Sequence, residues 1–172
     1  SLLETLRAHA HEQLAAEGGL PAAQLSHAGF YTRFAQEVFT GLVGDEQAAW
    51  MARALADHDN CLTALRRAIA ESDGATAIAI AGSLWWFWVR RGLFAMAREL
   101  LTAALQLPAT NLADRARALN GLAAFWLADE DYEANLVCHA EGLTLRRELN
   151  DADGIATVLH NMGLTAIITG DY

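Results

Sequence analysis

Apolar residues recur every three or four positions along most of the chain, which is the spacing of one face of an α-helix. Clusters of Gly, Asn and Asp interrupt the pattern at intervals of helical length. Pro21 follows Gly18 and Gly19 at a place suited to the first turn of a helix. The pattern therefore predicts helices over residues 2–16, 22–42, 45–56, 59–71, 74–91, 93–107, 112–128, 131–149 and 152–169.

Residues 57–60, with the sequence Asp-His-Asp-Asn, separate two of these predicted helices. Asp and Asn are favoured N-cap residues, so this segment can begin a new helix. The alternative is a kink inside one long helix, and the pattern leaves both open. Ala and Leu, two strong helix formers, make up 62 of the 172 residues, and only two Pro interrupt them. The sequence therefore predicts an all-α fold.

Two long stretches without charge, 74–89 and 154–170, are 16 and 17 residues long. Both are shorter than the roughly 20 apolar residues that a membrane-spanning helix needs, so we expect two buried helices and no membrane association. Cys61 and Cys138 are too few for a disulfide framework, and the first residues show no signal-peptide pattern. These features favour a cytoplasmic protein.

The charge composition excludes several functions for this segment. All 12 basic residues are Arg, and the absence of Lys rules out a P-loop and a Lys Schiff base within the chain. The 21 acidic residues bring the net charge to −9, whereas a face that binds nucleic acid needs clustered positive charge. We therefore expect no direct contact between this segment and nucleic acid.

The second half of the sequence repeats itself. Residues 118–132 align with residues 158–172 at a spacing of 40, and the neighbourhood of Ile80 aligns with the first of these units at a spacing of 38. Such a repeat indicates stacked helix hairpins. We expect a linker region of about four helices over residues 1–72, then two full hairpins and the first helix of a third over residues 73–172. The aligned residues are Leu84, Leu122 and Met162; Trp88 and Trp126; Gly92, Glu130 and Gly170 at the turns; and Phe94, Tyr132 and Tyr172 after them.

The first helix of a unit places a Leu or Met, then a small residue, then an aromatic residue on one side, except that Ala166 replaces the aromatic residue in the third unit. We expect Trp126 to fill the space between the helices of its unit, because large aromatic side chains dominate such packing. Trp85 departs from the pattern, since it stands at the small position of the first unit. After the turn, an aromatic residue is expected to wedge between the two helices.

These repeats resemble the tetratricopeptide repeat (TPR) in its longer variety of about 40 residues, over about residues 74–172. The resemblance implies a right-handed α-solenoid of TPR-like helix hairpins preceded by the helical linker region. No copy carries the full signature. In the second copy, Asn135 and His139 stand where small and bulky apolar residues are usual.

Three stretches, the last of them within the repeats, carry a second resemblance: residues 3–10 (LETLRAHA), 57–65 (DHDNCLTAL) and 81–88 (AGSLWWFW) with Arg91 and Gly92. They resemble bacterial STAND-type predicted ATPases, which include LuxR-type and SARP-like transcriptional regulators. In that group a nucleotide-binding module is followed by a helical linker and a TPR array. The resemblance implies that this chain is the linker and the first repeats of such a regulator, with the nucleotide, DNA and output motifs outside the chain.

Few side chains are spaced for catalysis or metal binding. His9 and His11 would point to different faces of a helix, and His58 with Cys61 is a half-site without a second pair. We expect both cysteines to be small buried apolar residues. The acidic segment 129–131 is expected to be a turn in which Asp131 caps the next helix, and residues 151–154 are expected to be a turn leading into a helix. We therefore expect no metal site, no cofactor and no enzymatic activity.

One stripe along the first helices is expected to line the concave face of the solenoid, where TPR-like proteins often bind peptides. Trp86 offers flat apolar area, Arg117 a fixed charge, and Asn120 and His160 equivalent polar positions 40 residues apart. The alternative is that the predicted helix 22–42 covers this stripe. The predicted partner-binding residues are Trp86, Val89, Arg117, Asn120, Leu127, His160 and Leu164.

The expected function is an interaction module, the sensor portion of a bacterial signalling or transcriptional regulator. It would bind a partner protein, a peptide or a small effector. A stand-alone scaffold for protein assembly is the alternative. The last predicted helix, with Ile155, Val158 and Ile167, has no hairpin partner, so we expect self-association through this end of the chain.

Overall fold

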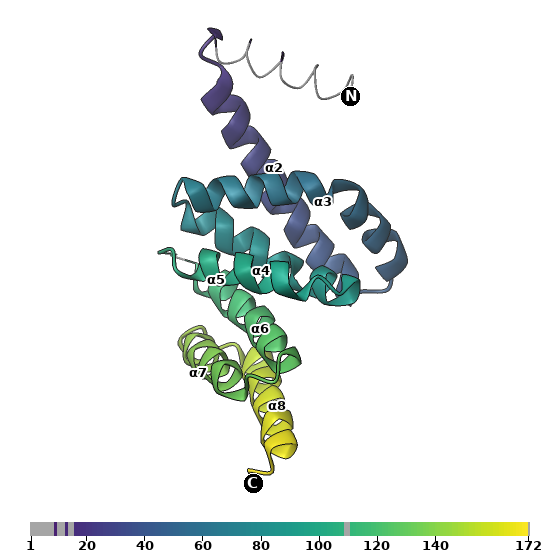
Figure 1. Cartoon of the computed structure of the whole chain (residues 1–172), viewed down its shortest axis with the longest axis vertical. Helices are drawn as coiled ribbons and strands as arrows, with labels where there is room; N and C mark the ends of the chain where they lie inside the picture. The colour runs from purple at the N-terminus through teal and green to yellow at the C-terminus, as the bar shows by residue number, and fades with distance from the viewer. Residues whose placement is uncertain (1–8, 10–12, 14–15, 109–110, 172) are drawn as a thin grey trace.

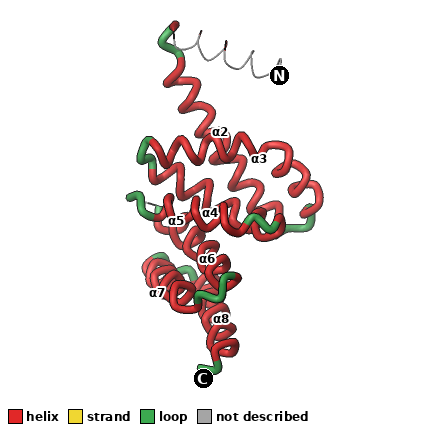
Figure 2. The backbone as a smooth tube through the Cα atoms, in the orientation of Figure 1, coloured by secondary structure: helices red, strands yellow, loops and turns green. Residues whose placement is uncertain are grey.

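The computed structural model describes residues 9, 13, 16–108 and 111–171, and this part of the chain is helical throughout with short connections (Figure 2). It contains no strand, so the all-α prediction is confirmed for the described residues. Most of the predicted helix 2–16, together with His11 and Tyr172, lies outside them. The helices are α2 (Leu20–Val43), α3 (Gln47–Ala70), α4 (Gly74–Arg91), α5 (Phe94–Leu105), α6 (Leu112–Ala128), α7 (Tyr132–Glu148) and α8 (Ala152–Thr169).

The helices follow one another along the long axis of the molecule, from α2 at one end to α8 at the other (Figure 1). Helix α4 packs against α2, α3, α5 and α6, and α6 packs in turn against α7. Helix α8 packs against α7 at the end of the row. The start of α2 lies at one end of the molecule (Figure 1), and the α2 side chains Leu25 and Phe30 are exposed.

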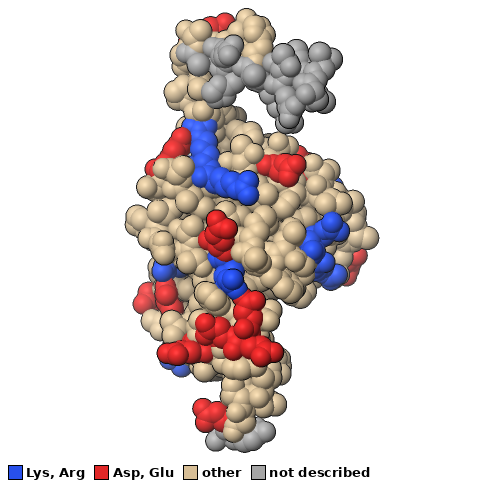
Figure 3. Space-filling model, in the orientation of Figure 1, with Lys and Arg blue, Asp and Glu red and all other residues tan. Residues whose placement is uncertain are grey.

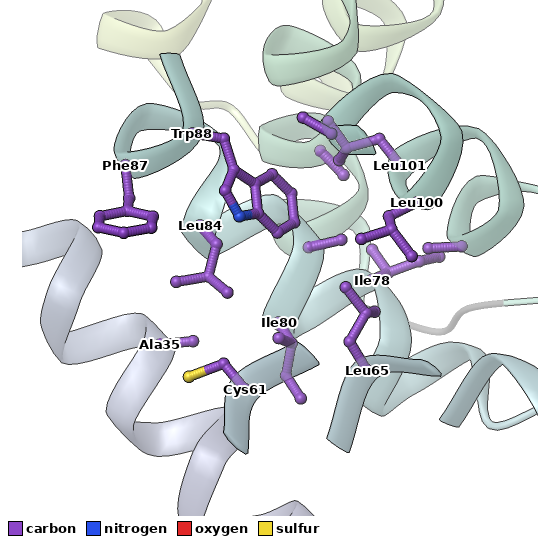
Figure 4. Packing of buried hydrophobic residues seen from close by; sticks show 14 of the residues in the cluster. Ala35, Cys61, Leu65, Ile78, Ile80, Leu84, Phe87, Trp88, Leu100 and Leu101 are labelled. Carbon is purple, nitrogen blue, oxygen red and sulfur yellow. The ribbon is translucent and has the colours of Figure 1, made fainter. Parts of the chain in front are cut away.

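The core lies around α4, as predicted for the uncharged stretch 74–89. Ile80, Leu84, Phe87 and Trp88 of this helix are fully buried, together with side chains from α2, α3 and α5 (Figure 4). Large apolar side chains contribute most to stability when they are removed from water. The central position of α4 therefore makes it the helix on which the others assemble.

Helix α3 is continuous from Gln47 to Ala70, so the prediction of two helices over 45–56 and 59–71 is wrong and the alternative of one long helix holds. The polar residues at its centre bind neighbouring helices instead of capping a helix. The Tyr31 hydroxyl donates to Asp57 Oδ1 at 3.0 Å, and Trp88 Nε1 donates to His58 Nε2 at 3.0 Å. Within residues 16–72 the linker region thus contains two helices in place of the three expected there.

The repeat predicted from sequence recurs in the turns. Gly92, Glu130 and Gly170 all adopt the left-handed conformation, with φ of 67°, 60° and 75°. In each turn the next N–H donates to the carbonyl five residues before it at 3.0 Å, as Leu93 does to Trp88. This is the hydrogen bond of the Schellman motif, which ends a helix and reverses the chain.

Asp side chains begin helices α7 and α8. Asp131 Oδ1 accepts from the Ala134 N–H at 3.0 Å, and Asp151 Oδ1 accepts from the Gly154 N–H at 2.9 Å. Both bonds satisfy donors that a helix N-terminus leaves free. The predicted capping role of Asp131 is therefore confirmed, and residues 151–154 begin a helix as predicted.

Burial follows the same spacings of 38 and 40. Ile80, Ala118 and Val158 are buried at equivalent positions, and so are Phe87, Phe125 and Thr165. The buried aromatic residue of the second unit is therefore Phe125, which is 1% exposed. Trp126 is only partly buried and lies under the Arg98 guanidinium at 4.9 Å from its ring, so its prediction as the buried side chain was wrong.

Helix α8 differs from the buried helix predicted for residues 154–170. Only Gly154, Val158 and Thr165 are buried, while Leu159 and Ile168 are 49% and 55% exposed. The reason is that α8 packs chiefly against α7, whereas α4 and α6 have neighbours on both sides. Across the described residues, no helix has both the length and the apolar character required to cross a membrane.

Candidate functional site

A cavity of about 200 Å³ lies where α4, α6, α7 and α8 meet. Four residues of the predicted partner-binding stripe line it together: Trp86, Asn120, Leu127 and Leu164. These residues come from α4, α6 and α8, which the sequence predicts to be the first helices of successive repeat units. The remaining lining residues are Trp85, Ala124, Asn135, His139 and Asn161.

The other three predicted residues lie elsewhere. Val89 is partly buried and packs against the main core. His160 is exposed and is not among the lining residues; its neighbour Asn161 reaches the cavity instead. Arg117 is held by internal partners and does not line the cavity.

Arg117 interacts with two elements of its own chain. Its guanidinium donates to Ser83 Oγ at 3.0 Å and lies 3.2 Å from Asp114 Oδ1. The same group lies over the Phe39 ring of α2 at 5.1 Å. Helix α2 therefore reaches the stripe at Arg117, and a ligand carboxylate or phosphate would have to compete with these internal contacts.

The wall of the cavity formed by α4 depends on a close approach to α6. A Cβ atom added to Gly121 would lie 2.5 Å from Trp85 Cβ, so only glycine leaves room for the indole at this place. The rings of Trp85 and Trp86 have their centroids 5.1 Å apart. The departure of Trp85 from the repeat pattern thus builds one side of the cavity, and the facing residue Gly121 accommodates it.

Asn135 forms the second wall and is fully buried. Its Nδ2 donates to the Ala123 carbonyl at 2.8 Å, and its Oδ1 accepts from Thr165 Oγ1 at 2.9 Å. The side chain therefore connects α7 to both α6 and α8. A buried amide with both ends satisfied fixes the position of the groups around it.

Two buried polar atoms beside the cavity have no hydrogen-bond partner among the described residues. They are Trp85 Nε1 and His139 Nδ1. The His139 side chain is only 3% exposed, and burial lowers the pKa of its imidazole below the ordinary value of 6.5. Most buried polar groups in proteins are paired, so two such atoms at one cavity require an explanation.

The rest of the cavity surface is neutral. Asn161 Nδ2 donates to Asn120 Oδ1 at 3.2 Å, and Trp86, Ala124, Leu127 and Leu164 supply apolar surface. Among the described residues, none of the lining side chains carries a charge at neutral pH. In contrast, acidic side chains gather on the outer face over α7 and its neighbouring turns (Figure 3).

We expect the free energy of unfolding to fall as the pH is lowered below 6.5. Burial lowers the pKa of His139 and of His58, so the unfolded chain binds protons at a higher pH than the folded chain does. The contribution of the two neutral histidines to the free energy of unfolding is therefore fully present above pH 6.5 and is lost as the pH falls below this value. Urea unfolding at about pH 7.5 and about pH 5.5 measures the effect, which is at most about 1.4 kcal/mol per pH unit for each histidine.

His139→Gln should reduce this pH dependence, because the variant retains a polar side chain that does not titrate. His160→Gln is the matched control, since it makes the same substitution at an exposed position outside the cavity. An identical slope in wild type and His139→Gln would contradict the assignment to His139.

The two cysteines considered as candidates in the sequence lie among the packed helices. Cys61 and Cys138 are buried as expected, and burial raises the pKa of their thiols to about 12 and about 11. Both therefore remain protonated at neutral pH and are poor nucleophiles. No cluster of three or more His, Cys, Asp or Glu side chains suited to a metal ion occurs among the described residues.

Sequence analysis did not place Trp85, Asn135, His139 and Asn161 at the site. The signal for three of them was nevertheless present, because Trp85, Asn135 and His139 are the residues that depart from the repeat pattern. Asn161 gave no such signal. No protein-family model matches the chain, and no curated protein matches it in sequence.

Proposed function

We propose that this chain is a non-enzymatic interaction module, built as a right-handed α-solenoid of TPR-like hairpins after a helical linker region. The observation that carries the proposal is the cavity in which Trp86, Asn120, Leu127 and Leu164 meet on one face. A concave, mostly apolar site with a few convergent polar groups is the usual form of a binding site.

The repeat architecture is supported by features that recur at the predicted spacings. Left-handed turn residues end three successive first helices, and Phe87, Phe125 and Thr165 are buried at equivalent positions. A solenoid places its first helices side by side, which brings their inner side chains onto one surface. Residues from α4, α6 and α8 lining one cavity fit this arrangement.

The role within a larger protein follows from the resemblance to STAND-type regulators. In this proposal the module is the sensor portion of a cytoplasmic signalling or transcriptional regulator, and binding at its inner face biases an attached module. Such a bias requires that the ligand bind one state of the regulator more tightly than the other. The acidic surface favours a partner that is not a nucleic acid.

Selection of a displayed library of random peptides on the whole chain tests the proposal. Peptides retained by the inner face should bind Leu164→Glu at least about tenfold more weakly, because the new carboxylate would lie at the edge of an uncharged cavity. Ile168→Glu is the matched control on the same helix, since Ile168 is exposed and does not line the cavity.

Leu164 is itself 42% exposed, so its replacement by Glu should leave the fold intact. Circular dichroism of both variants checks this point. Peptides that bind both variants as well as wild type, or a library from which none is retained, would contradict an interaction role for this face.

A further inference from the structure

Trp126 lies between two shallow hollows on the surface of the molecule. One hollow, of about 480 Å³, is lined mostly by α5, and the other, of about 400 Å³, by α7 and its N-cap residue. Because Trp126 lines both, the hollows meet at this residue. Ala124, which lines the inner cavity, lies two residues earlier in α6 and therefore points about 200° away around the helix. The two hollows and Trp126 between them, the Trp126 surface, thus lie apart from that cavity.

The centre of the Trp126 surface is apolar and partly open to solvent. Trp126 is only partly buried, and Val137, which lines the second hollow, is 63% exposed. Small side chains lie on both sides of the indole, with Ala95 and Ala103 in one hollow and Ala134 in the other. This arrangement leaves room for a side chain of a partner to pack against the ring. Trp is also among the residues that contribute most to binding at protein interfaces.

The charged residues around this centre are mostly acidic. Glu99 lines one hollow, and Asp131 and Glu133 line the other. Glu99 and Glu133 are exposed and form no ion pair among the described residues. Arg98 is the single cation among the described lining residues of the two hollows, and its charge is balanced by an ion pair with Asp129. The Trp126 surface therefore carries a net negative charge, in keeping with the acidic side chains over α7 in Figure 3.

Arg98 shows how this surface accommodates a cation. Its guanidinium lies 4.9 Å from the centre of the Trp126 ring and pairs with the Asp129 carboxylate. The face of an indole ring attracts positive charge, and a nearby carboxylate adds to the attraction. Arg98 balances Asp129 alone, so the remaining carboxylates can attract cations from a partner.

We propose that the Trp126 surface binds a basic segment of a partner protein. The segment places a large apolar side chain against Trp126 and Val137, and Arg or Lys side chains beside Glu99 and Glu133. The inference goes beyond the proposed function, because it concerns a second surface and needs no ligand in the inner cavity.

Charge complementarity selects this occupant. Nucleic acid and an anionic membrane would bring further negative charge to an acidic surface. A second copy of this chain would do the same, since its net charge is −9. A basic protein segment supplies the opposite charge together with the apolar side chain that the centre of the surface can cover.

Selection of a displayed library of random peptides on the whole chain carrying Leu164→Glu tests the inference. This replacement places a charge at the inner cavity, so peptides that depend on the cavity are lost from the selection. The retained peptides should carry a net positive charge and at least one large apolar residue. The tightest of them is synthesised with a fluorescent label, and anisotropy measures its affinity for the wild-type chain and for the variants below.

Two double variants separate local charge from overall charge. Glu99→Gln with Glu133→Gln neutralises carboxylates of the Trp126 surface. Glu37→Gln with Glu148→Gln makes the same change in net charge at exposed positions that line neither hollow. The first pair should weaken the peptide about three- to tenfold, as expected for the loss of two exposed ion pairs. The second pair should change the affinity less than about twofold, because salt screens distant charges.

The apolar centre is tested by Trp126→Ala, which should weaken the peptide at least about tenfold. Because this replacement also removes packing within the chain, Val137→Ser is the second variant and should weaken the peptide several-fold. Val43→Ser is its matched control, since Val43 is 60% exposed at the end of α2 and lines neither hollow. Circular dichroism checks that each variant is folded.

Four results would overturn the inference: no retained peptide, retained peptides without net positive charge, equal losses in the two double variants, or equal losses in the two serine variants. Equal losses in the double variants would mean that only overall charge attracts the peptide. The inner cavity is judged separately, by peptides selected on the wild-type chain. Basic peptides that depend on the Trp126 surface, without any peptide that depends on Leu164, would overturn the proposed role of the inner face and support this inference.

Discussion

Phe125→Ala should lower the free energy of unfolding by about 3–5 kcal/mol, the range for a fully buried aromatic residue cut back to alanine. Phe125 is 1% exposed and its ring centroid lies 5.8 Å from that of Phe94, the aromatic residue that follows the preceding turn. Its removal leaves a void between two repeat units. Chemical denaturation followed by circular dichroism measures the loss.

Trp126→Ala is the control for this prediction because it removes a larger side chain from the next position. Trp126 is only partly buried and interacts with Arg98, so we expect a loss of about 1–2 kcal/mol. A loss at Trp126 equal to or greater than that at Phe125 would show that the buried aromatic position of the second unit has been assigned to the wrong residue.

Asn135→Ala should cost about 2–4 kcal/mol, since it removes two buried hydrogen bonds and leaves a void beside the cavity. The lost bonds are those to the Ala123 carbonyl at 2.8 Å and from Thr165 Oγ1 at 2.9 Å. The effect should be concentrated in α8, whose amide protons should exchange faster with solvent. Denaturation and hydrogen exchange measure the two effects.

Asn161→Ala serves as the comparison for Asn135→Ala. Asn161 also donates an amide hydrogen bond in the cavity, to Asn120 at 3.2 Å, but its side chain is partly exposed. Water can replace a partner that is lost at such a position, so the cost should be under about 1 kcal/mol. Equal costs for the two variants would argue against the connecting role of Asn135.

The all-α class and most helix boundaries could be predicted from the apolar spacing and from Gly, Asn and Asp at the turns. Gly92, Glu130 and Gly170 were predicted to lie at equivalent turns, and all three adopt the left-handed conformation, as do Ser72 and Asn150. The repeat spacing found the first three of these positions even though Glu is rarely left-handed.

The errors arose where tertiary contacts override a local signal. Residues 57–60 look like a helix start, but Asp57 and His58 find partners in α2 and α4, and the helix continues. Phe125 and Trp126 are adjacent aromatic residues, and the repeat register selected the larger one. Which of the two faces the core depends on the rotation of α6 against its neighbours, and one sequence carries little information about that rotation.

The site was predicted in part for a related reason. The stripe predicted along α4, α6 and α8 correctly brought together Trp86, Asn120, Leu127 and Leu164, which line one cavity. Arg117 was predicted to bind a ligand, and its internal partners Ser83 and Asp114 could not be foreseen from spacing. Three of the residues that complete the cavity, Trp85, Asn135 and His139, were visible only as exceptions to the repeat, and such an exception shows its role only when a structure places it.

The order of the helices along the molecule has a consequence for how the chain folds. Among the described residues, every pair of helices in extensive contact is adjacent in sequence or separated by one helix. Few long loops must close before native contacts form, so the entropic barrier to folding is low and the chain should fold rapidly for its length. The extensive core around α4 makes that helix the favoured starting point, and α8, with a single main neighbour, is the last to join.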